Sequence, residues 1–444
     1  MEGFSFDMAD LLAQVGSSPF YAMWYIFTHG GFLLFIYAFG WAALKLWVHW
    51  RQTLESRKKE YIVLAIDIPK LTEKEPGQSM RGVENIFAHL AGAHSPTSWR
   101  EKWIDGKYQD PLSFEVVSIE GRVQFVIRCL RVLRDLVEAS IFAQYPEAEI
   151  NEIEDYAKRV PTWYPDREWD LYGTEMVPVK PVPFPLRTYE DFEHSMSGEF
   201  KDPIAVLLEG FSRLGPGEQA WLQLLALPID QKSYVEKVMA LVKKLKGEVT
   251  VKPPSILDQI ITLPLKLLVF VGETAFGAGA APAKPAGKSD QPLAAKMFNL
   301  SPGERKVLEK VENKASKIGY TCKLRFIYVA KKNVFKKPKI VGSFVGYIKQ
   351  MNTNDMQALK PESNYVGVNG ALWFMRDKRN DARKRKLISN YRGRSVWYGM
   401  PPFDMCTEEL ATLWHFPHTH QVRAPQLKKR EVKFAEPPMN LPIG

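Results

Sequence analysis

The sequence predicts an α+β protein with one N-terminal transmembrane helix, two small α+β units and a basic C-terminal segment. Three observations lead to this prediction. An apolar stretch fills residues 20–50, strand and helix patterns alternate along most of the chain after it, and positive charge is concentrated toward the C-terminus. A chain of 444 residues has room for two or three domains with cores of their own.

The predicted transmembrane helix covers residues 20–50 and follows an extracytoplasmic N-terminus of residues 1–19. From Tyr21 to Leu44 the chain carries no Asp, Glu, Lys or Arg, and a spanning helix needs about 20 such residues. Basic residues follow the stretch but do not precede it, so the positive-inside rule places the N-terminus outside and the rest in the cytoplasm. We therefore expect a single-pass protein of the cytoplasmic (inner) membrane. The role of His29, inside the stretch, stays open between a functional and an interfacial residue.

The first soluble unit, residues 60–160, has the ferredoxin-like pattern of elements. β-branched apolar runs mark its strands, and apolar residues three and four positions apart mark its helices. The order is strand, helix, strand, strand, helix, strand, which is the split βαβ arrangement. These elements are expected at residues 61–69, 83–90, 114–119, 123–129, 133–141 and 149–156.

The second unit, residues 165–350, is expected to be another ferredoxin-like α+β unit of similar size. An inserted segment, residues 253–295, interrupts it with an apolar run and an Ala/Pro/Gly linker. Pro264 and Lys266 make the run better suited to an interfacial or buried helix than to a span, and whether residues 255–272 touch the membrane stays open. The strands and helices of this unit are expected at residues 169–180, 203–214, 220–227, 235–245, 322–330 and 340–351.

Charge is distributed unevenly along the chain. Residues 301–444 hold 28 of the 60 Lys and Arg residues but only 12 of the 50 Asp and Glu residues. This asymmetry indicates an anionic partner, either nucleic acid or the anionic inner leaflet, with a merely solvated basic surface as the alternative. The three cysteines, Cys129, Cys322 and Cys406, lie far apart without a CxxC pair, which favours buried thiols in a reducing compartment.

The basic C-terminal segment, residues 351–444, contains the densest charged feature of the chain. Nine basic residues fall between Arg376 and Arg394, where a helix would present cations on nearly every face and be too charged for a core. Aromatic residues such as Phe374, Tyr391 and Trp397 flank the run as possible stacking groups. DNA is the favoured partner, and lipid or an acidic protein is the alternative. The candidate DNA-binding residues are Arg376, Lys378, Arg379, Arg383, Lys384, Arg385, Lys386, Arg392 and Arg394.

The sequence indicates no enzyme active site, cofactor or metal centre. Gly287–Ser289 ends like a phosphate-binding P-loop, but Pro282 stands where its first glycine belongs. His415, His418 and His420 have a spacing that allows metal binding, yet a loop with incidental histidines is the preferred interpretation, and their role stays open. We therefore predict a protein that is not an enzyme.

Four segments resemble one family. They are residues 198–225 (GEFKDPIAVLLEGFSRLGPGEQAWLQLL), the basic run, Thr407–His418 and Ala435–Gly444. Together they are similar to the region before the ATPase core in membrane-anchored HerA/FtsK-type motor proteins of type IV secretion and conjugative coupling systems, especially those of small-genome bacteria. In that family the ATPase would begin after a segment like PPMNLPIG. This sequence stops there, so the resemblance implies either a motor on a separate polypeptide or an anchoring half adapted to another task. It carries over no active-site residue.

We expect a membrane-anchoring, non-catalytic component of a type IV secretion or conjugation-like DNA-translocation machine, which docks the motor or guides DNA. Its expected partners are a separately encoded HerA/FtsK-type ATPase, DNA, membrane lipid and further copies of itself. The resembled motors form rings, so the homo-oligomer includes a hexamer among its expected forms. The alternative is a membrane-bound scaffold that binds only protein or anionic lipid. Stoichiometry, the choice between DNA and protein as substrate, and the identity of the motor stay open.

Overall fold

The computed structural model describes residues 24, 27–28, 32–68, 78–193, 202–246, 301–368 and 374–417. Its contacts divide the chain into two compact units. The first unit comprises Met1–Ile62, His94–Asp110 and Leu130–Val132, and the second comprises Val63–Ala93, Pro111–Cys129 and Leu133–Gly444.

The first unit is built on helix α3 (Phe32–Ser56) and the short helix η3 (Glu101–Asp105). The Trp47 indole donates to the Trp103 carbonyl at 3.3 Å, and Arg51 Nε donates to the Ile104 carbonyl at 2.6 Å. Gly106 follows η3 with φ +75°, and a Cβ there would lie 2.5 Å from the Arg51 backbone. Only glycine accommodates both this conformation and this close approach.

The predicted transmembrane helix is wrong. Among the described residues, no helix is both long enough and apolar enough to cross a membrane. Helix α3 contains the second half of the predicted span 20–50, and its apolar part, Phe32–Leu44, ends at Lys45. Most of residues 20–31, the first part of the predicted span, lie outside the described residues. His29 lies outside the described residues. The orientation that the flanking charges predict stays a prediction, since it presupposes a membrane span.

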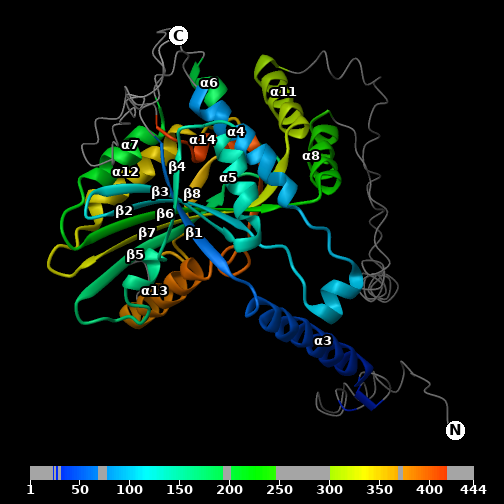
Figure 1. Ribbon diagram of the computed structural model, residues 1–444. Coiled ribbons are helices and arrows are strands. Elements are labelled where there is room, and N and C mark those ends of the chain that lie inside the picture. Colours follow the sequence, from blue (N-terminus) through cyan, green and yellow to red (C-terminus); the bar gives the residue numbers. More distant parts are fainter. Residues whose placement is uncertain are drawn as a thin grey trace, which may run out of the picture. The chain divides into compact units, whose positions relative to one another are not determined.

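The second unit contains a nine-stranded antiparallel sheet (Figure 1). Its strands follow the order β4-β1-β3-β2-β6-β7-β5-β8, and β9 pairs with the beginning of β7. The strands are β1 (Tyr61–Asp67), β2 (Leu112–Ile119), β3 (Arg122–Leu130), β4 (Glu149–Ile153), β5 (Trp169–Pro178), β6 (Glu218–Pro228), β7 (Gly319–Lys331), β8 (Leu359–Pro361) and β9 (Phe403–Cys406).

The prediction of two ferredoxin-like units is wrong, because one sheet runs through both halves of the chain. Strand β2 pairs with β6 along its whole length, from Leu112↔Ala226 to Ile119↔Gln219. Both strands are buried on both faces. The near-continuous apolar run of β6 is typical of such a central strand, whereas a strand with one solvated face alternates between polar and apolar residues.

The individual elements lie within a few residues of their predicted positions, although their assembly differs. The predicted helices correspond to α4 (Gln78–Leu90), α5 (Arg134–Phe142), α7 (Ile204–Ser212), α8 (Gln231–Leu245) and α12 (Lys337–Gln350). The sequence analysis did not specify the short helices η5 (Tyr156–Arg159), α6 (Tyr189–Glu193) and α14 (Thr407–Leu413), the longer helix α11 (Pro302–Ser316), or the strands β8 and β9.

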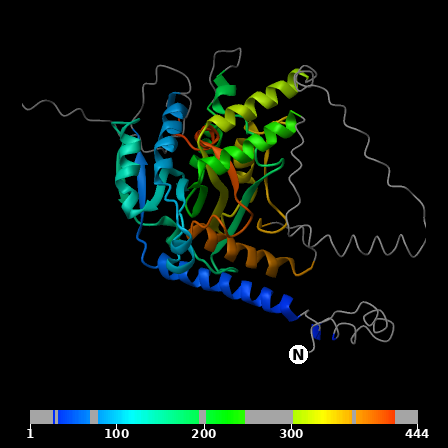
Figure 2. The ribbon, with the colours of Figure 1, turned by 90° about the vertical axis from the view of Figure 1, so that its right-hand side faces the viewer.

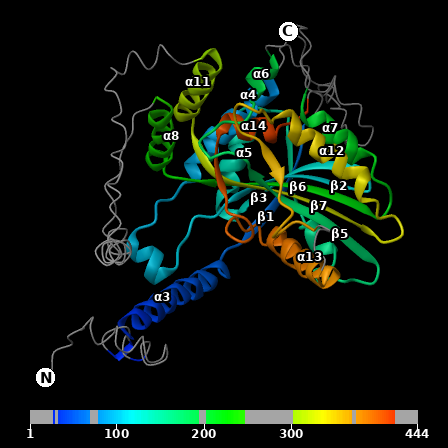
Figure 3. The same cartoon turned by 180° about the vertical axis from the view of Figure 1, so that it is seen from behind.

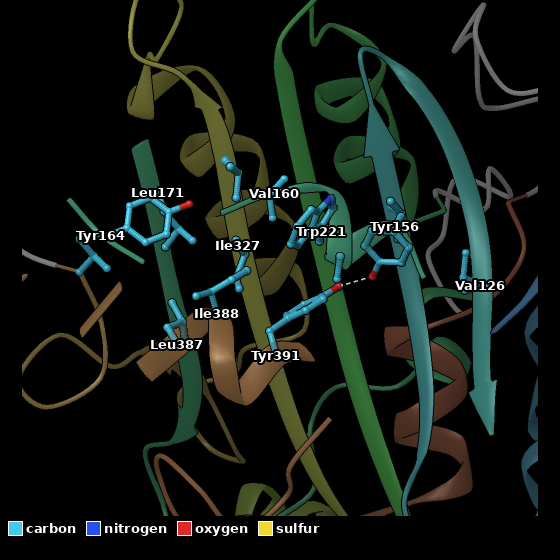
Figure 4. Packing of buried hydrophobic residues seen from close by; sticks show 14 of the residues in the cluster. Val126, Tyr156, Val160, Tyr164, Leu171, Trp221, Ile327, Leu387, Ile388 and Tyr391 are labelled. Atoms are coloured by element: carbon cyan, nitrogen blue, oxygen red, sulfur yellow. Dashed lines mark hydrogen bonds between the residues drawn. The ribbon is translucent and has the colours of Figure 1, made fainter. Parts of the chain in front are cut away.

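Helices cover the two faces of the sheet unequally. Helices α7 and α12 pack together on one face, where Phe326 of β7 stacks on Phe344 of α12 with ring centroids 4.1 Å apart. Helix α13 (Arg376–Arg392) lies on the opposite side of the sheet, as the view from behind also shows (Figure 3). Buried residues of this second layer, including Trp221, Ile327 and Tyr391, form one continuous cluster (Figure 4).

Helices α8 and α11 lie side by side at one end of the sheet (Figure 2). Their shared core contains Tyr234 and Val238 from α8 and Leu308 and Val311 from α11. Leu245, at the end of α8, and Gly303, at the start of α11, line one small cavity of about 290 Å³. The end of α8 and the start of α11 therefore lie close together. The predicted insert, residues 253–295, lies outside the described residues.

A fragment of residues 60–160 tests the continuity of the sheet. Without β6 it exposes the unpaired backbone and apolar side chains of β2, and such an edge associates with other chains. We expect this fragment to aggregate or to unfold without cooperativity in size-exclusion chromatography and urea denaturation. A fragment of residues 60–417, which retains β6, is the matched control. A monomeric fragment 60–160 with a sharp unfolding transition would contradict the single-sheet description.

Candidate nucleic-acid interface

A row of polar side chains crosses the sheet beneath α13. Glu115 of β2 lies opposite Gln223 of β6, Gln223 opposite Arg325 of β7, and Arg325 opposite Glu175 of β5. All four side chains are fully buried. Gln223 Nε2 donates to Glu115 at 3.0 Å, Arg325 Nη1 donates to Gln223 at 3.1 Å, and Arg325 Nε donates to Glu175 at 2.7 Å. The row is therefore a continuous hydrogen-bonded chain in which Arg325 neutralises Glu175, and Glu115 needs a second cation.

Arg394, just after α13, connects this row to the covering layer. Its Nε donates to Glu115 at 3.0 Å, and its Nη1 donates to Asp155 at 2.5 Å. Burial alone would raise the pKa of Glu115, but the charge and hydrogen bonds of Arg394 outweigh burial and lower that pKa below its ordinary value. Tyr156 also donates to Glu115, at 2.7 Å, and its hydroxyl lies 2.6 Å from that of Tyr391 (Figure 4). Glu115 is thus held as a carboxylate.

Helix α13 presents a buried stripe to the sheet. Leu387, Ile388 and Tyr391 are buried, and Arg383, one turn earlier, is 9% exposed. Arg383 Nη1 donates to the carbonyls of Ser363 at 3.0 Å and Gly367 at 2.8 Å, and its Nη2 donates to the Asn364 carbonyl. The expectation that the run is too charged to enter the core is therefore wrong. Arginine enters here because carbonyl oxygens satisfy its donors.

Several other candidate cations are also engaged within the protein. Lys384 pairs with Asp170 at 2.5 Å. Arg392 donates to the carbonyls of Ala157, at 2.8 Å, and Val160. These contacts, with those of Arg383 and Arg394, anchor α13 to β5, η5 and the segment before α13. Their first role is to position the helix.

The exposed candidates are Arg376, Lys378, Arg379 and Lys386. Three of them lie in the first turn of α13, where Asp377 is the exposed acid. Arg385 is partly exposed, and its guanidinium lies 4.3 Å from the ring centre of Trp163, a distance suited to a cation–π contact. Of the flanking aromatics, Phe374 and Trp397 are exposed and Tyr391 is buried.

The fold brings further basic residues to α13 that the sequence analysis did not identify. Lys158 and Arg159 are exposed on η5, which packs against the end of α13 through Arg392 and Tyr391. The signal was weak, because two cations more than 200 residues before α13 do not form a basic run. Together these residues extend the exposed positive charge from the beginning of α13 to its end.

The loop after α13 is held by buried charged groups. Arg325 Nη2 donates to the Ser395 carbonyl at 2.5 Å and to the Tyr398 carbonyl at 3.0 Å, and Lys323 Nζ donates to the Tyr398 carbonyl at 2.8 Å. The Met400 amide donates to Glu175 at 2.6 Å. The pKa of Lys323 is lowered to about 8, chiefly by burial; the charge of Glu175 opposes this shift, and the charge of Arg325 contributes to it.

The histidines and cysteines carry structural contacts in the described part of the chain. His415 is buried, with Nε2 2.8 Å from Asp202 and Nδ1 2.9 Å from the Ala411 carbonyl. All three cysteines are buried and free, as expected, and burial raises the pKa of Cys129 to about 12. No group of three or more metal-ligating side chains occurs among the described residues. His418, His420 and Gly287–Ser289 lie outside them.

Comparison with known proteins identifies no relative. No family model matches the chain, and no curated protein matches it.

Replacing Arg394 by alanine tests the charge balance beneath α13. The change leaves Glu115 buried without its arginine, which is expected to lower the free energy of unfolding by about 3–5 kcal/mol. The exposed Arg379, replaced in the same way, should change it by less than about 0.5 kcal/mol. Urea denaturation at neutral pH measures both values. Similar small losses in the two variants would show that Glu115 does not depend on Arg394.

Lys323 makes stability depend on alkaline pH. Its pKa falls from 10.5 to about 8 in the folded protein, so between these values the unfolded chain binds a proton that the folded protein does not. The contribution of Lys323 to the free energy of unfolding therefore increases as pH rises from about 8 to 10.5, and it is lost as pH falls through 8. We expect the free energy of unfolding, taken relative to that of a Lys323→Met variant, to rise over this range. A constant difference between the native protein and the Lys323→Met variant over this pH range would contradict the assignment.

Proposed function

We propose that this protein is a non-catalytic, DNA-contacting component of a DNA-translocation machine that is driven by an ATPase of the HerA/FtsK type. The observation that carries the proposal is the division of α13. Its buried stripe fixes the helix on the sheet, while Arg376, Lys378, Arg379 and Lys386 remain exposed. Cations held on a rigid element suit contact with a regular array of phosphates.

The geometry favours contact with the DNA backbone over recognition of bases. One side of α13 packs against the sheet through Leu387, Ile388 and Tyr391, and the exposed candidate residues on it are all lysines and arginines. Lysine and arginine contacts to phosphate position DNA but carry no sequence information directly. A component with such contacts would guide DNA of any sequence, which is what translocation requires.

The motor and the assembly are part of the same proposal. The resemblance to pre-ATPase regions supports an ATPase of this type as the source of the driving force. Four exposed cations on one helix are a small footprint for a long polyanion, so several copies would hold DNA more firmly by raising the effective concentration of contacts. We therefore place the protein in a homo-oligomer, with a six-fold ring as the form that matches the resembled motors.

The second candidate is a scaffold that binds only protein or anionic lipid. Phe374 and Met375 are exposed directly before the cations of the first turn of α13. Apolar side chains beside basic ones suit the headgroup region of an anionic membrane surface. This arrangement makes anionic vesicles the necessary comparison in any DNA-binding experiment.

Removing the exposed cations of α13 tests the proposal. A variant with alanine at Arg376, Lys378, Arg379 and Lys386 should bind DNA of all sequences more weakly. The dependence of its binding on salt should fall by up to about four phosphate contacts, roughly 0.9 each in the logarithmic slope on duplex. Fluorescence anisotropy with labelled oligonucleotides at several salt concentrations measures both effects.

The matched control carries alanine at Lys232, Lys306, Lys349 and Lys360, which are exposed on α8, α11, α12 and β8. It has the same net charge as the α13 variant, so a loss specific to α13 separates a binding surface from overall electrostatic attraction. If both variants lose DNA affinity equally, the proposal of a DNA-binding surface on α13 is wrong. If the α13 variant keeps its DNA affinity but loses binding to anionic vesicles, the scaffold alternative replaces the proposal.

A further inference from the structure

The loop after α13 combines a fixed backbone with exposed aromatic side chains. Buried Arg325, Lys323 and Glu175 hold its backbone, as described above. Gly399, in the loop, has φ +97°, and a Cβ there would lie 2.4 Å from Glu175 Oε1, so this position requires glycine. Trp397 and Tyr398 are nevertheless 66% and 58% exposed. Large aromatic side chains on a pre-organised backbone lose little conformational entropy on binding, which is typical of binding hot spots.

A cavity of about 520 Å³ opens beside Trp397. This volume falls within the range of about 300–1,000 Å³ that is common for binding pockets. Most of its wall is apolar and comes from three separate parts of the chain. The apolar lining consists of Val182, Pro183, Tyr234, Val238, Trp397, Pro402 and Phe403.

Lys237 is the cation of this cavity that retains free donors. Lys314 also lines the cavity, but its ammonium group contacts both carboxylate oxygens of Glu409 and the Asp404 carbonyl, which occupies its three donors. Asp404 accepts from Thr321 at 2.6 Å and from Lys237 at 2.9 Å. The Lys237 side chain is 58% exposed, and an ammonium group has three donors, so it can hold a second carboxylate.

The surrounding surface of α8 is positive. Lys232, Lys243 and Lys244 are exposed on this helix together with Lys237, and Glu236 is its exposed acid. An approaching acidic chain is therefore attracted to the same end of the fold that contains the apolar cavity.

We propose that this cavity docks an acidic, extended peptide segment of a partner protein, which places a proline or aromatic side chain against Trp397 and a carboxylate on Lys237. Aromatic grooves flanked by prolines suit extended, proline-containing chains, whose backbone needs little ordering on binding. The site is separate from the α13 surface and does not depend on DNA binding.

Selection from a displayed library of random peptides on the immobilised full chain tests this proposal. We expect enriched peptides to be acidic and to contain a proline or aromatic residue. Their affinities are then measured by fluorescence anisotropy on purified variants. Trp397→Ala and Lys237→Ala should each weaken binding at least about tenfold, as expected for hot-spot residues.

Two variants provide matched controls. Trp163→Ala removes a tryptophan that is 69% exposed beside α13, and Lys386→Ala removes an exposed cation of α13. Both should bind the selected peptides within about twofold of the native protein, since neither lines the cavity. Urea denaturation of the Trp397→Ala variant should show a native-like transition, because the side chain it removes is largely exposed.

Three results would overturn the proposal. The first is equal enrichment on the native chain and on the Trp397→Ala chain. The second is enrichment of basic peptides. The third is displacement of the bound peptides by a labelled oligonucleotide whose affinity for the Trp397→Ala variant is lower than for the native protein. This result would make the cavity a nucleic-acid site. Loss of DNA binding in the α13 variant alone would leave the peptide site unaffected, so the two proposals fail independently.

Discussion

The second unit depends on the neutralisation of charge inside its sheet. Glu115 and Glu175 are fully buried, and Arg325 and Arg394 are buried against them. An unpaired buried ion costs several kcal/mol, so neither partner is tolerated without the other. Because Arg394 comes from the C-terminal part of the chain and Glu115 from the N-terminal part, residues 279 positions apart must meet before the core is stable. The sheet and its α13 layer are therefore expected to form in one cooperative step.

This constraint also separates two kinds of cation in one basic run. Arg383, Arg392 and Arg394 direct their guanidinium groups to carbonyls and carboxylates of the protein, whereas the cations of the first turn of α13 face solvent. The structural group holds the helix in place, and the exposed group is then free to bind a partner. The loop after α13 has the same division, because buried charged groups hold its backbone while Trp397 and Tyr398 are exposed.

Sequence periodicity was sufficient to locate most strands and helices, because local burial imposes a period on side chains. It did not predict that β2 and β6 pair, since the residues that meet are about a hundred positions apart and the period carries no register. The continuous apolar run of β6 was the available sign of a central strand. At the candidate site, the density of basic residues indicated where α13 lies in the sequence, but not which side of the helix packs against the sheet. The apolar stripe of Leu387, Ile388 and Tyr391 contained that information, whereas the burial of Arg325 and Lys323 depends on partners that only the fold supplies.

The neighbouring ends of α8 and α11 have a practical consequence. Leu245 and Gly303 line a common cavity, so any chain that joins them needs to bridge only a short gap. The entropy of closing such a connection grows only with the logarithm of its length. A fluorescent protein whose own termini lie close together can therefore be spliced between these helices, giving an optical reporter of the intact molecule at the end of the fold where α8 carries its lysines.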